Sequence, residues 1–252
     1  MKRFLITLLL AMPVFADDLK VMPLIVQGDA EERQHHVRTA LSLFEQAERI
    51  DANDPGVLLR IAKAYLDLVD ESKSPEDKQD AEHAVEYSKR AVQIAPANAK
   101  AHLGVAAGYG RLTDFVGSKT KIEYSRIIKD ETDRALSLDA TDDFAWNILG
   151  RWNFAVANVN GLLKALAEIA YGGLPPASNE EAARCYKKAV ELAPQRLMHH
   201  SGLARAYTAI GKPELAAKEW KTVLTLRPTG GEEENDRRDA LKALGVVKEE
   251  GK

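Results

Sequence analysis

Residues 197–228 read LMHHSGLARAYTAIGKPELAAKEWKTVLTLRP and contain one nearly uninterrupted helical repeat. Small and large apolar side chains recur three or four positions apart in each half, at Leu203, Ala204, Tyr207, Ala216, Trp220 and Val223. Side chains at these spacings lie on one face of a helix. Gly211 lies between the halves, and Pro228 ends the second because proline lacks an N–H group. The stretch therefore predicts two helices that pack closely through small residues.

The same pattern recurs along the chain at uneven intervals. Equivalent positions in the second helix are Ala47, Ala91, Ala135, Ala189 and Val223, which are 44, 44, 54 and 34 residues apart. The first-helix pattern begins at Leu58, His102, Trp146 and His200. The 34-residue interval is that of a tetratricopeptide repeat, whereas 44 residues would suit HEAT-type repeats, the structural alternative. The helix-pair pattern favours an all-α, tetratricopeptide-like, right-handed solenoid with elongated hairpins.

The longest interval contains an insertion over residues 158–176. Residues 158–161 read NVNG, and asparagine and glycine favour helix ends over helix interiors. Apolar residues then return at helical spacing at Leu162, Leu163, Leu166 and Ile169, before the break GGLPP at 172–176. We expect a short amphipathic helix between the two helices of its repeat. It would either pack on a neighbouring helix or form a lid over a groove.

The first sixteen residues differ from the rest. Lys2 and Arg3 precede a short apolar run, and small residues precede Asp17, as in a secretory signal peptide. The run is shorter than the roughly 20 residues of a spanning helix, although an uncleaved membrane anchor is the alternative. Cleavage after Ala16 would make the protein periplasmic or secreted. The sequence thus predicts a signal peptide over 1–16, a tetratricopeptide-like repeat domain over 17–229, and a C-terminal capping helix and tail over 230–252.

The composition is that of an ordinary soluble protein, with 45% hydrophobic and 29% charged residues. Removing residues 1–16 takes away Lys2 and Arg3 and changes the net charge from −3 to −5. This mild acidity gives no overall attraction to nucleic acid. We expect no membrane-spanning segment in the mature chain. Cys185 is the single cysteine, so the chain forms no intramolecular disulfide.

The first helices of such a solenoid line its concave surface, where extended ligands bind. On each first helix, the residues beside the packed positions should face this surface. They predict a polar stripe made of Lys63, Arg111, Asn147, Arg151 and Arg205. A guanidinium group can hold a carboxylate or a phosphate through two parallel hydrogen bonds. The stripe would suit an acidic peptide, a chain terminus or a lipid headgroup. The alternative is that the arginines pair with Asp and Glu on adjacent helices.

Other reactive side chains do not form a catalytic or metal-binding pattern. Neighbouring helical residues point about 100° apart, so neither His35-His36 nor His199-His200 chelates one metal ion. We expect these histidines to be exposed or at the edge of the core, and Cys185 to be a buried packing residue. The sequence predicts no metal, no cofactor and no enzymatic activity.

A more specific similarity lies in the motif Asp139-x3-Asp143-x2-Trp146-x2-Leu149-Gly150-Arg151-Trp152-x-Phe154-x-Val156-Ala157-Asn158. Together with GLPPAS at 173–178 and GSKTKI at 117–122, it resembles the signature of the regulator of microtubule dynamics family. The resemblance covers roughly residues 100–228 and implies a tetratricopeptide-like interaction domain. Eukaryotic members are associated with microtubules and membrane contact sites. Because an exported protein would meet no cytosolic tubulin, we carry over the fold, the binding role and, more weakly, lipid handling.

Two functional hypotheses follow. The first is an exported, non-enzymatic scaffold that binds a protein or peptide, acidic in character, in the concave groove. The second is a lipid-binding or lipid-carrying solenoid in which the 158–176 insertion is a lid over phospholipid chains. A polar groove floor would favour a peptide, and an apolar tunnel would favour a lipid.

Overall fold

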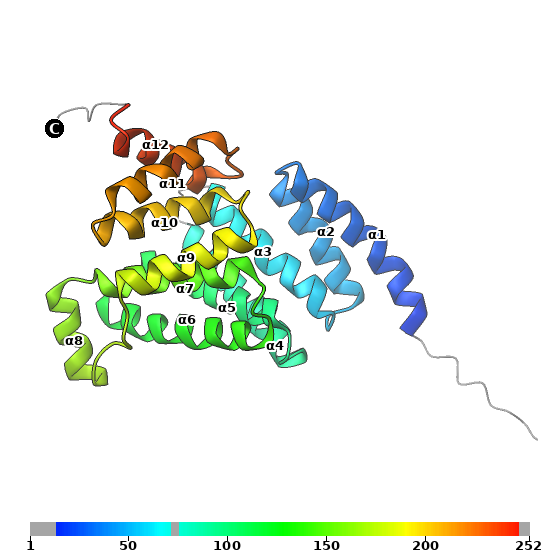
Figure 1. Cartoon of the computed structure of the whole chain (residues 1–252). Helices are drawn as coiled ribbons and strands as arrows, with labels where there is room; N and C mark the ends of the chain where they lie inside the picture. The colour runs from blue at the N-terminus through cyan, green and yellow to red at the C-terminus, as the bar shows by residue number, and fades with distance from the viewer. Residues whose placement is uncertain (1–13, 72–75, 247–252) are drawn as a thin grey trace, which may run out of the picture.

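The computed structural model describes residues 14–71 and 76–246 of the 252-residue chain. Within these ranges the regular structure is helical, and no strand is present (Figure 1). Residues 1–13, most of the predicted signal peptide, lie outside the described residues, as do residues 247–252 of the predicted tail. The predicted cleavage point after Ala16 falls in the first turn of the first helix.

Helices make up five antiparallel pairs and two additions within the described ranges. The helices are α1 (Val14–Arg33), α2 (Val37–Ile50), α3 (Pro55–Glu71), α4 (Asp77–Ile94), α5 (Ala99–Leu112), the 3-10 helix η1 (Thr113–Phe115), α6 (Ser118–Leu138), α7 (Asp143–Ala157), α8 (Gly161–Tyr171), α9 (Asn179–Leu192), α10 (Leu197–Ala209), α11 (Pro213–Thr225) and α12 (Gly231–Ala243). The pairs are α1–α2, α3–α4, α5–α6, α7–α9 and α10–α11. The predicted all-α tetratricopeptide-like solenoid is confirmed, and α8 is the predicted insertion.

Local sequence signals explain where the inserted helix begins and ends. The Asn160 side chain accepts a hydrogen bond from the backbone N–H of Leu163 at 2.9 Å and so caps α8. At the other end Gly172 has a φ of 69°, a left-handed conformation that glycine adopts without a steric penalty. Ser178 then caps α9 by accepting from the N–H of Glu181 at 3.0 Å. These caps make α8 a separate element between α7 and α9.

The pairs α7–α9 and α10–α11 meet around one aromatic ring. Tyr186 of α9 is 4% exposed, and its ring faces Gly150 of α7 and Gly202 of α10. A β-carbon added at Gly150 would lie 2.9 Å from the ring, and one added at Gly202 would lie 2.3 Å from it. Both positions therefore need glycine for the helices to approach this closely.

His102 and His200 occupy equivalent positions in two repeats and make equivalent contacts. In His102, Nδ1 lies 2.5 Å from a Glu131 oxygen and Nε2 lies 3.0 Å from the carbonyl oxygen of Pro96. In His200, the corresponding distances are 2.6 Å to Glu219 and 2.9 Å to Pro194. Burial lowers the pKa of His200, but the hydrogen bonds to Glu219 and to the Pro194 carbonyl outweigh it, so the pKa is raised. Because both nitrogens of this ring face acceptors, the geometry suits the doubly protonated form.

Candidate binding groove

Three of the predicted groove residues lie on the first helices of successive pairs. Arg111 belongs to α5, Arg151 to α7 and Arg205 to α10. Their side chains all meet carboxylates of the C-terminal helix α12, so the structure brings these three together. We call Arg111, Arg151 and Arg205 the basic stripe.

One face of α12 supplies carboxylate partners to all three arginines of the basic stripe. Glu232 places one oxygen 3.0 Å from Nη2 of Arg111 and the other 3.2 Å from Nη1 of Arg151. Asp236 and Asp239 both contact Nη2 of Arg205, at 2.6 Å and 2.8 Å. Glu232, Asp236 and Asp239 are spaced by four and three residues, so they share one helical face. We call these three residues the acidic face of α12.

The pKa values of two carboxylates on the acidic face are shifted in opposite directions. Burial raises the pKa of Glu232, but Arg151 and Arg111 outweigh burial, so its pKa is lowered and it stays ionised. Asp236 is 5% exposed, and burial raises its pKa despite the opposing effects of Arg205 and of a 2.5 Å hydrogen bond from Ser201. The charge on Asp236 is thus less well compensated than the charge on Glu232.

Lys63 lies on α3 and forms its ion pairs with carboxylates of α1 and α3. Its ammonium group contacts Asp67 of the same helix at 2.6 Å and also contacts Glu32 of α1. Burial lowers the pKa of Lys63, but these two carboxylates raise it overall. Lys63 therefore serves to join α1 to α3.

Asn147 does not line an open groove, so its predicted role is wrong. Its side chain is 1% exposed, and Nδ2 donates a hydrogen bond to Nδ1 of His199 at 3.0 Å. Nε2 of His199 in turn lies 2.7 Å from Asp143. Burial lowers the pKa of His199, and the neutral ring with its proton on Nε2 satisfies both contacts. Asn147 is thus part of the packing between α7 and α10, and His199, fully buried, is a core residue instead of an edge residue.

A hollow lies beside Arg205, at the edge of α12. It has a volume of about 510 Å³ and is bordered by α7, α10, α11 and α12. Its lining residues are Phe154, Arg205, Thr208, Ala209, Trp220, Asp239, Lys242 and Ala243. The Arg205 guanidinium also lies over the Trp220 ring, 5.5 Å from its centre. Aromatic rings and charges of both signs therefore surround this space, a setting that suits an amphipathic protein segment better than an acyl chain.

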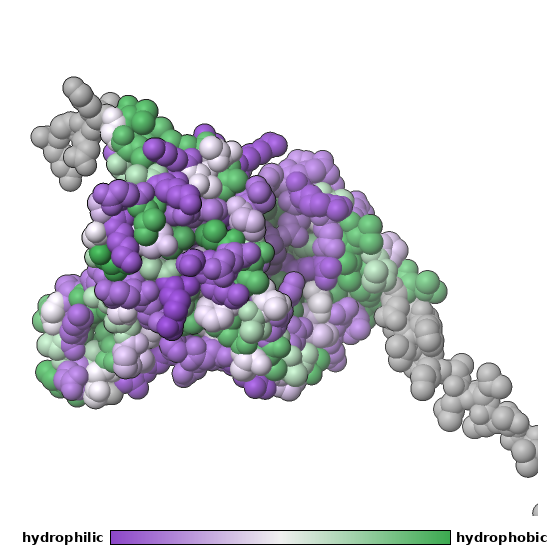
Figure 2. All heavy atoms as spheres, viewed as in Figure 1, coloured by the Kyte–Doolittle hydropathy of each residue, from purple (hydrophilic) through white to green (hydrophobic). Residues whose placement is uncertain are grey.

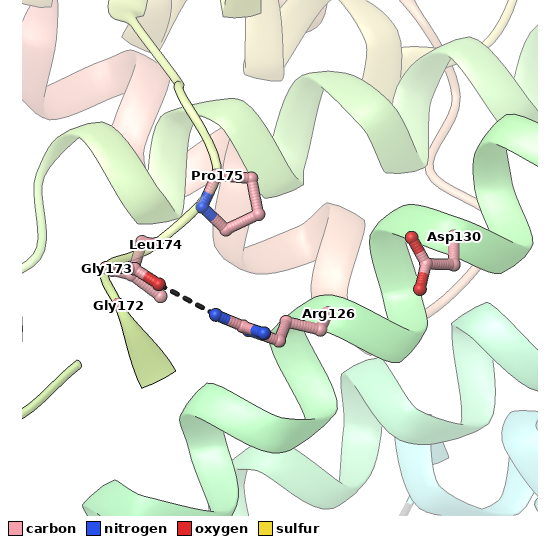
Figure 3. Close-up of a pocket in the computed structure, with 6 residues that line it drawn as sticks. All are labelled: Arg126, Asp130, Gly172, Gly173, Leu174 and Pro175. Carbon is pink, nitrogen blue, oxygen red and sulfur yellow. Dashed lines mark hydrogen bonds between the residues drawn. The ribbon is translucent and has the colours of Figure 1, made fainter. Parts of the chain in front are cut away.

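A second hollow, of about 310 Å³, lies away from the basic stripe (Figure 3). Figure 3 shows Arg126 reaching from α6 to the carbonyl oxygen of Gly173, a hydrogen bond of 2.9 Å. Asp130 lies one turn further along α6, and residues 172–175 form the opposite wall. This hydrogen bond fastens the end of the insertion to α6.

The insertion does not cover the basic stripe. Helix α8 makes its main tertiary contact with α6, the second helix of the α5–α6 pair. It lies far from α12 in Figure 1. Leu162 is 74% exposed and Ile169 is 86% exposed. Figure 2 shows apolar residues gathered at the corner of the molecule where Figure 1 places α8. The lid hypothesis is therefore wrong about where the inserted helix lies.

The described residues include neither a cluster that could hold a metal ion nor a helix that could cross a bilayer. Across residues 14–71 and 76–246, no three His, Cys, Asp or Glu side chains are placed to hold a metal ion. Burial, followed by Glu181, raises the pKa of the Cys185 thiol to about 12, which keeps it protonated and a poor nucleophile. In the same ranges, no helix combines the length and apolar character that crossing a bilayer requires.

Comparison with known proteins agrees with this architecture. The family described as "Regulator of microtubule dynamics protein 1-3" matches residues 24–247. The chain belongs to this family. It is 28% identical to human regulator of microtubule dynamics protein 2 over 191 residues, covering 75% of this chain and 47% of that protein. It is 25% identical to mouse regulator of microtubule dynamics protein 1 over 201 residues, covering 79% of this chain and 65% of that protein.

The chain thus spans about half to two thirds of the length of these family members. Among solved structures, a thermophilic tetratricopeptide-repeat protein of Thermus thermophilus superposes with a TM-score of 0.66. The alignment covers 90% of this chain and 100% of that protein at 18% sequence identity, so it shows the fold alone. The comparisons thus establish the family and agree with the tetratricopeptide-like fold.

Proposed function

We propose that this member of the regulator of microtubule dynamics family is an exported, non-enzymatic scaffold that binds a protein or peptide along the basic stripe. The predicted signal peptide over residues 1–16 supports a periplasmic or secreted location. The partner segment carries carboxylates that meet Arg111, Arg151 and Arg205. The solenoid contributes a rigid framework that holds the three guanidinium groups in a row.

One observation carries this proposal. Every arginine of the basic stripe lies within 3.2 Å of a carboxylate oxygen from a single helical face. Three first helices of the solenoid thus present their charges at a spacing that matches an acidic helix. Arginine is suited to this role because its planar fork binds carboxylates with defined geometry.

Site-specific photocrosslinking in cells that export the protein tests the proposal. A photoreactive residue replaces Thr208, an exposed side chain in the hollow beside Arg205, and a control chain carries it at Lys187, exposed on α9. We expect a protein adduct from position 208 that disappears with Arg151→Glu. Adducts that form equally at both positions, or that survive the charge reversal, would overturn the proposal.

A further inference from the structure

We propose that α12 is a built-in occupant of the partner site, and that the partner contributes an acidic amphipathic helix that replaces it. The replacing helix would carry three carboxylates spaced as Glu232, Asp236 and Asp239 are. This inference rests on the proposed function and specifies the class of partner. It also makes the free protein self-blocked.

The surface that α12 turns to the solenoid is more charged than apolar. The helix buries one apolar side chain, Ala240, and its C-cap residue Leu244 packs partly buried against the same cluster. By contrast, α11 buries Ala216, Trp220 and Val223. Residues of the acidic face provide four ion pairs to α5, α7 and α10. A helix held in this way is replaceable by another helix with the same charges.

Two of these four pairs, Arg151–Glu232 and Arg205–Asp239, are largely open to solvent, which lowers the cost of exchange. The side chains of Arg151 and Glu232 are 48% and 40% exposed, and that of Asp239 is 49% exposed. Ion pairs of this exposure contribute little net stability, because water and salt screen them in either state. Glu232 nonetheless neutralises two guanidinium groups at once, so an empty basic stripe would favour a new anionic ligand.

The hollow beside Arg205 gives a partner helix an advantage over α12. Ala243 of α12 borders this hollow together with the rings of Phe154 and Trp220. A side chain larger than alanine at the corresponding place in a partner helix would enter the hollow and bury apolar surface there. The partner therefore combines the three carboxylates with a bulky apolar residue near the end of its helix.

Neutralising the acidic face while keeping the helix tests whether α12 blocks the basic stripe, without unfolding the end of the protein. Glu233 makes separate contacts: it accepts hydrogen bonds from the backbone N–H of Thr229 at 2.6 Å and of Met198 at 3.3 Å. The full-length variant Glu232→Gln/Asp236→Asn/Asp239→Asn keeps Glu233 and Ala240, so the attachment of the helix start is retained. A matched control, Glu180→Gln/Glu191→Gln/Glu214→Gln, removes three exposed carboxylates from elsewhere on the surface.

The test measures binding of a fluorescein-labelled synthetic peptide of residues 229–246 by fluorescence anisotropy at low salt. We expect the acidic-face variant to bind it at least tenfold more tightly than the wild-type chain or the control variant. A peptide carrying the same three neutral substitutions should bind none of them. Circular dichroism and thermal unfolding verify that each variant is folded.

Two results would overturn the inference. One is equal affinity of the wild-type chain and the acidic-face variant for the peptide, which would mean that α12 does not block the stripe. The other is equal binding of the neutral peptide, which would mean that charge is not what the site recognises. If crosslinking at position 208 succeeds while peptide binding fails, the scaffold function stands and this inference falls. If crosslinking fails while the peptide binds as expected, the proposed function and the partner helix both fall, and only the occupation of the stripe by α12 stands.

Discussion

Helices α8 and α12 are both additions to the regular pairs, yet they use their side chains in opposite ways. The inserted helix α8 exposes Leu162 and Ile169 to solvent, buries Ala167, and is connected to α6 by the hydrogen bond from Arg126 to Gly173. The C-terminal helix α12 is far more polar, yet it lies against the inner surface of the solenoid.

The difference shows that the position of a helix depends on the chemistry of the surface against which it packs. The apolar face of α8 predicts burial when α8 is considered alone, but the basic stripe offers it no complementary surface. The acidic face of α12 predicts solvent exposure, but the stripe attracts it by charge. Four predictions test this contrast, from the largest expected effect to the smallest.

Asp236→Ala should lower the free energy of unfolding by about 2 kcal/mol, measured by urea denaturation at pH 7. The change removes the acceptor of the Ser201 hydroxyl and one partner of Arg205. Asp236→Asn should cost less than half as much, because its amide oxygen still accepts from Ser201 and because the raised pKa of Asp236 shows that its charge is poorly compensated. Equal losses for the two variants would show that the charge of Asp236, and not its hydrogen bond from Ser201, stabilises this contact.

His200→Gln should flatten the pH dependence of the free energy of unfolding. The pKa of His200 is raised in the folded state, so its contribution is complete below the unfolded value of 6.5 and is lost as pH rises through the folded value. Urea denaturation between pH 5 and 9 should therefore show a flatter decline in the variant. If the two pH profiles run parallel, the contact between His200 and Glu219 does not stabilise the α10–α11 pair.

Salt should affect the two added helices differently. At about 1 M salt the screening length falls to about 3 Å, so the ion pairs of α12 weaken while the apolar packing of α8 does not. Hydrogen–deuterium exchange should show faster exchange of α12 amides in 1 M than in 0.05 M sodium chloride, with α8 unchanged. Equal acceleration of both helices would remove the proposed distinction between them.

Leu162→Ser/Ile169→Ser should change the free energy of unfolding by no more than about 0.5 kcal/mol, because both side chains are exposed. Ala167→Leu is the matched change on the buried face of the same helix, and overpacking there should cost about 1 kcal/mol or more. Thermal unfolding measures both. A large loss from the serine variant would mean that the apolar face of α8 is covered in solution.

The regular part of this fold follows from its sequence. Spacings of three and four residues identify the helix pairs, and the break before Leu162 identifies α8 as a separate helix. Such periodicity defines the face of each helix but not the curvature of the whole solenoid. The meeting of Arg111 with Glu232, 121 residues further on, depends on that curvature and does not follow from the periodicity.

Errors in the predicted site have the same origin. The offset along α7 assigns Asn147 to the concave surface, whereas the next pair covers that part of the helix and buries it against His199. The acidic spacing of Glu232, Asp236 and Asp239 is present in the sequence, within a segment predicted only as a cap. Searching for an acidic helical face to match a predicted basic stripe would have found it.

Tyr186 also acts as a spacer behind the basic stripe, although it carries no charge and is 4% exposed. Its ring separates Gly150 from Gly202. Gly150 directly precedes Arg151, and Gly202 lies three residues before Arg205. The thickness of one aromatic ring thus calibrates the distance between two of the three guanidinium groups. An alanine at either glycine would push the ring aside and change the spacing of the guanidinium groups, so it would alter the selectivity of the proposed site without replacing any of its arginines.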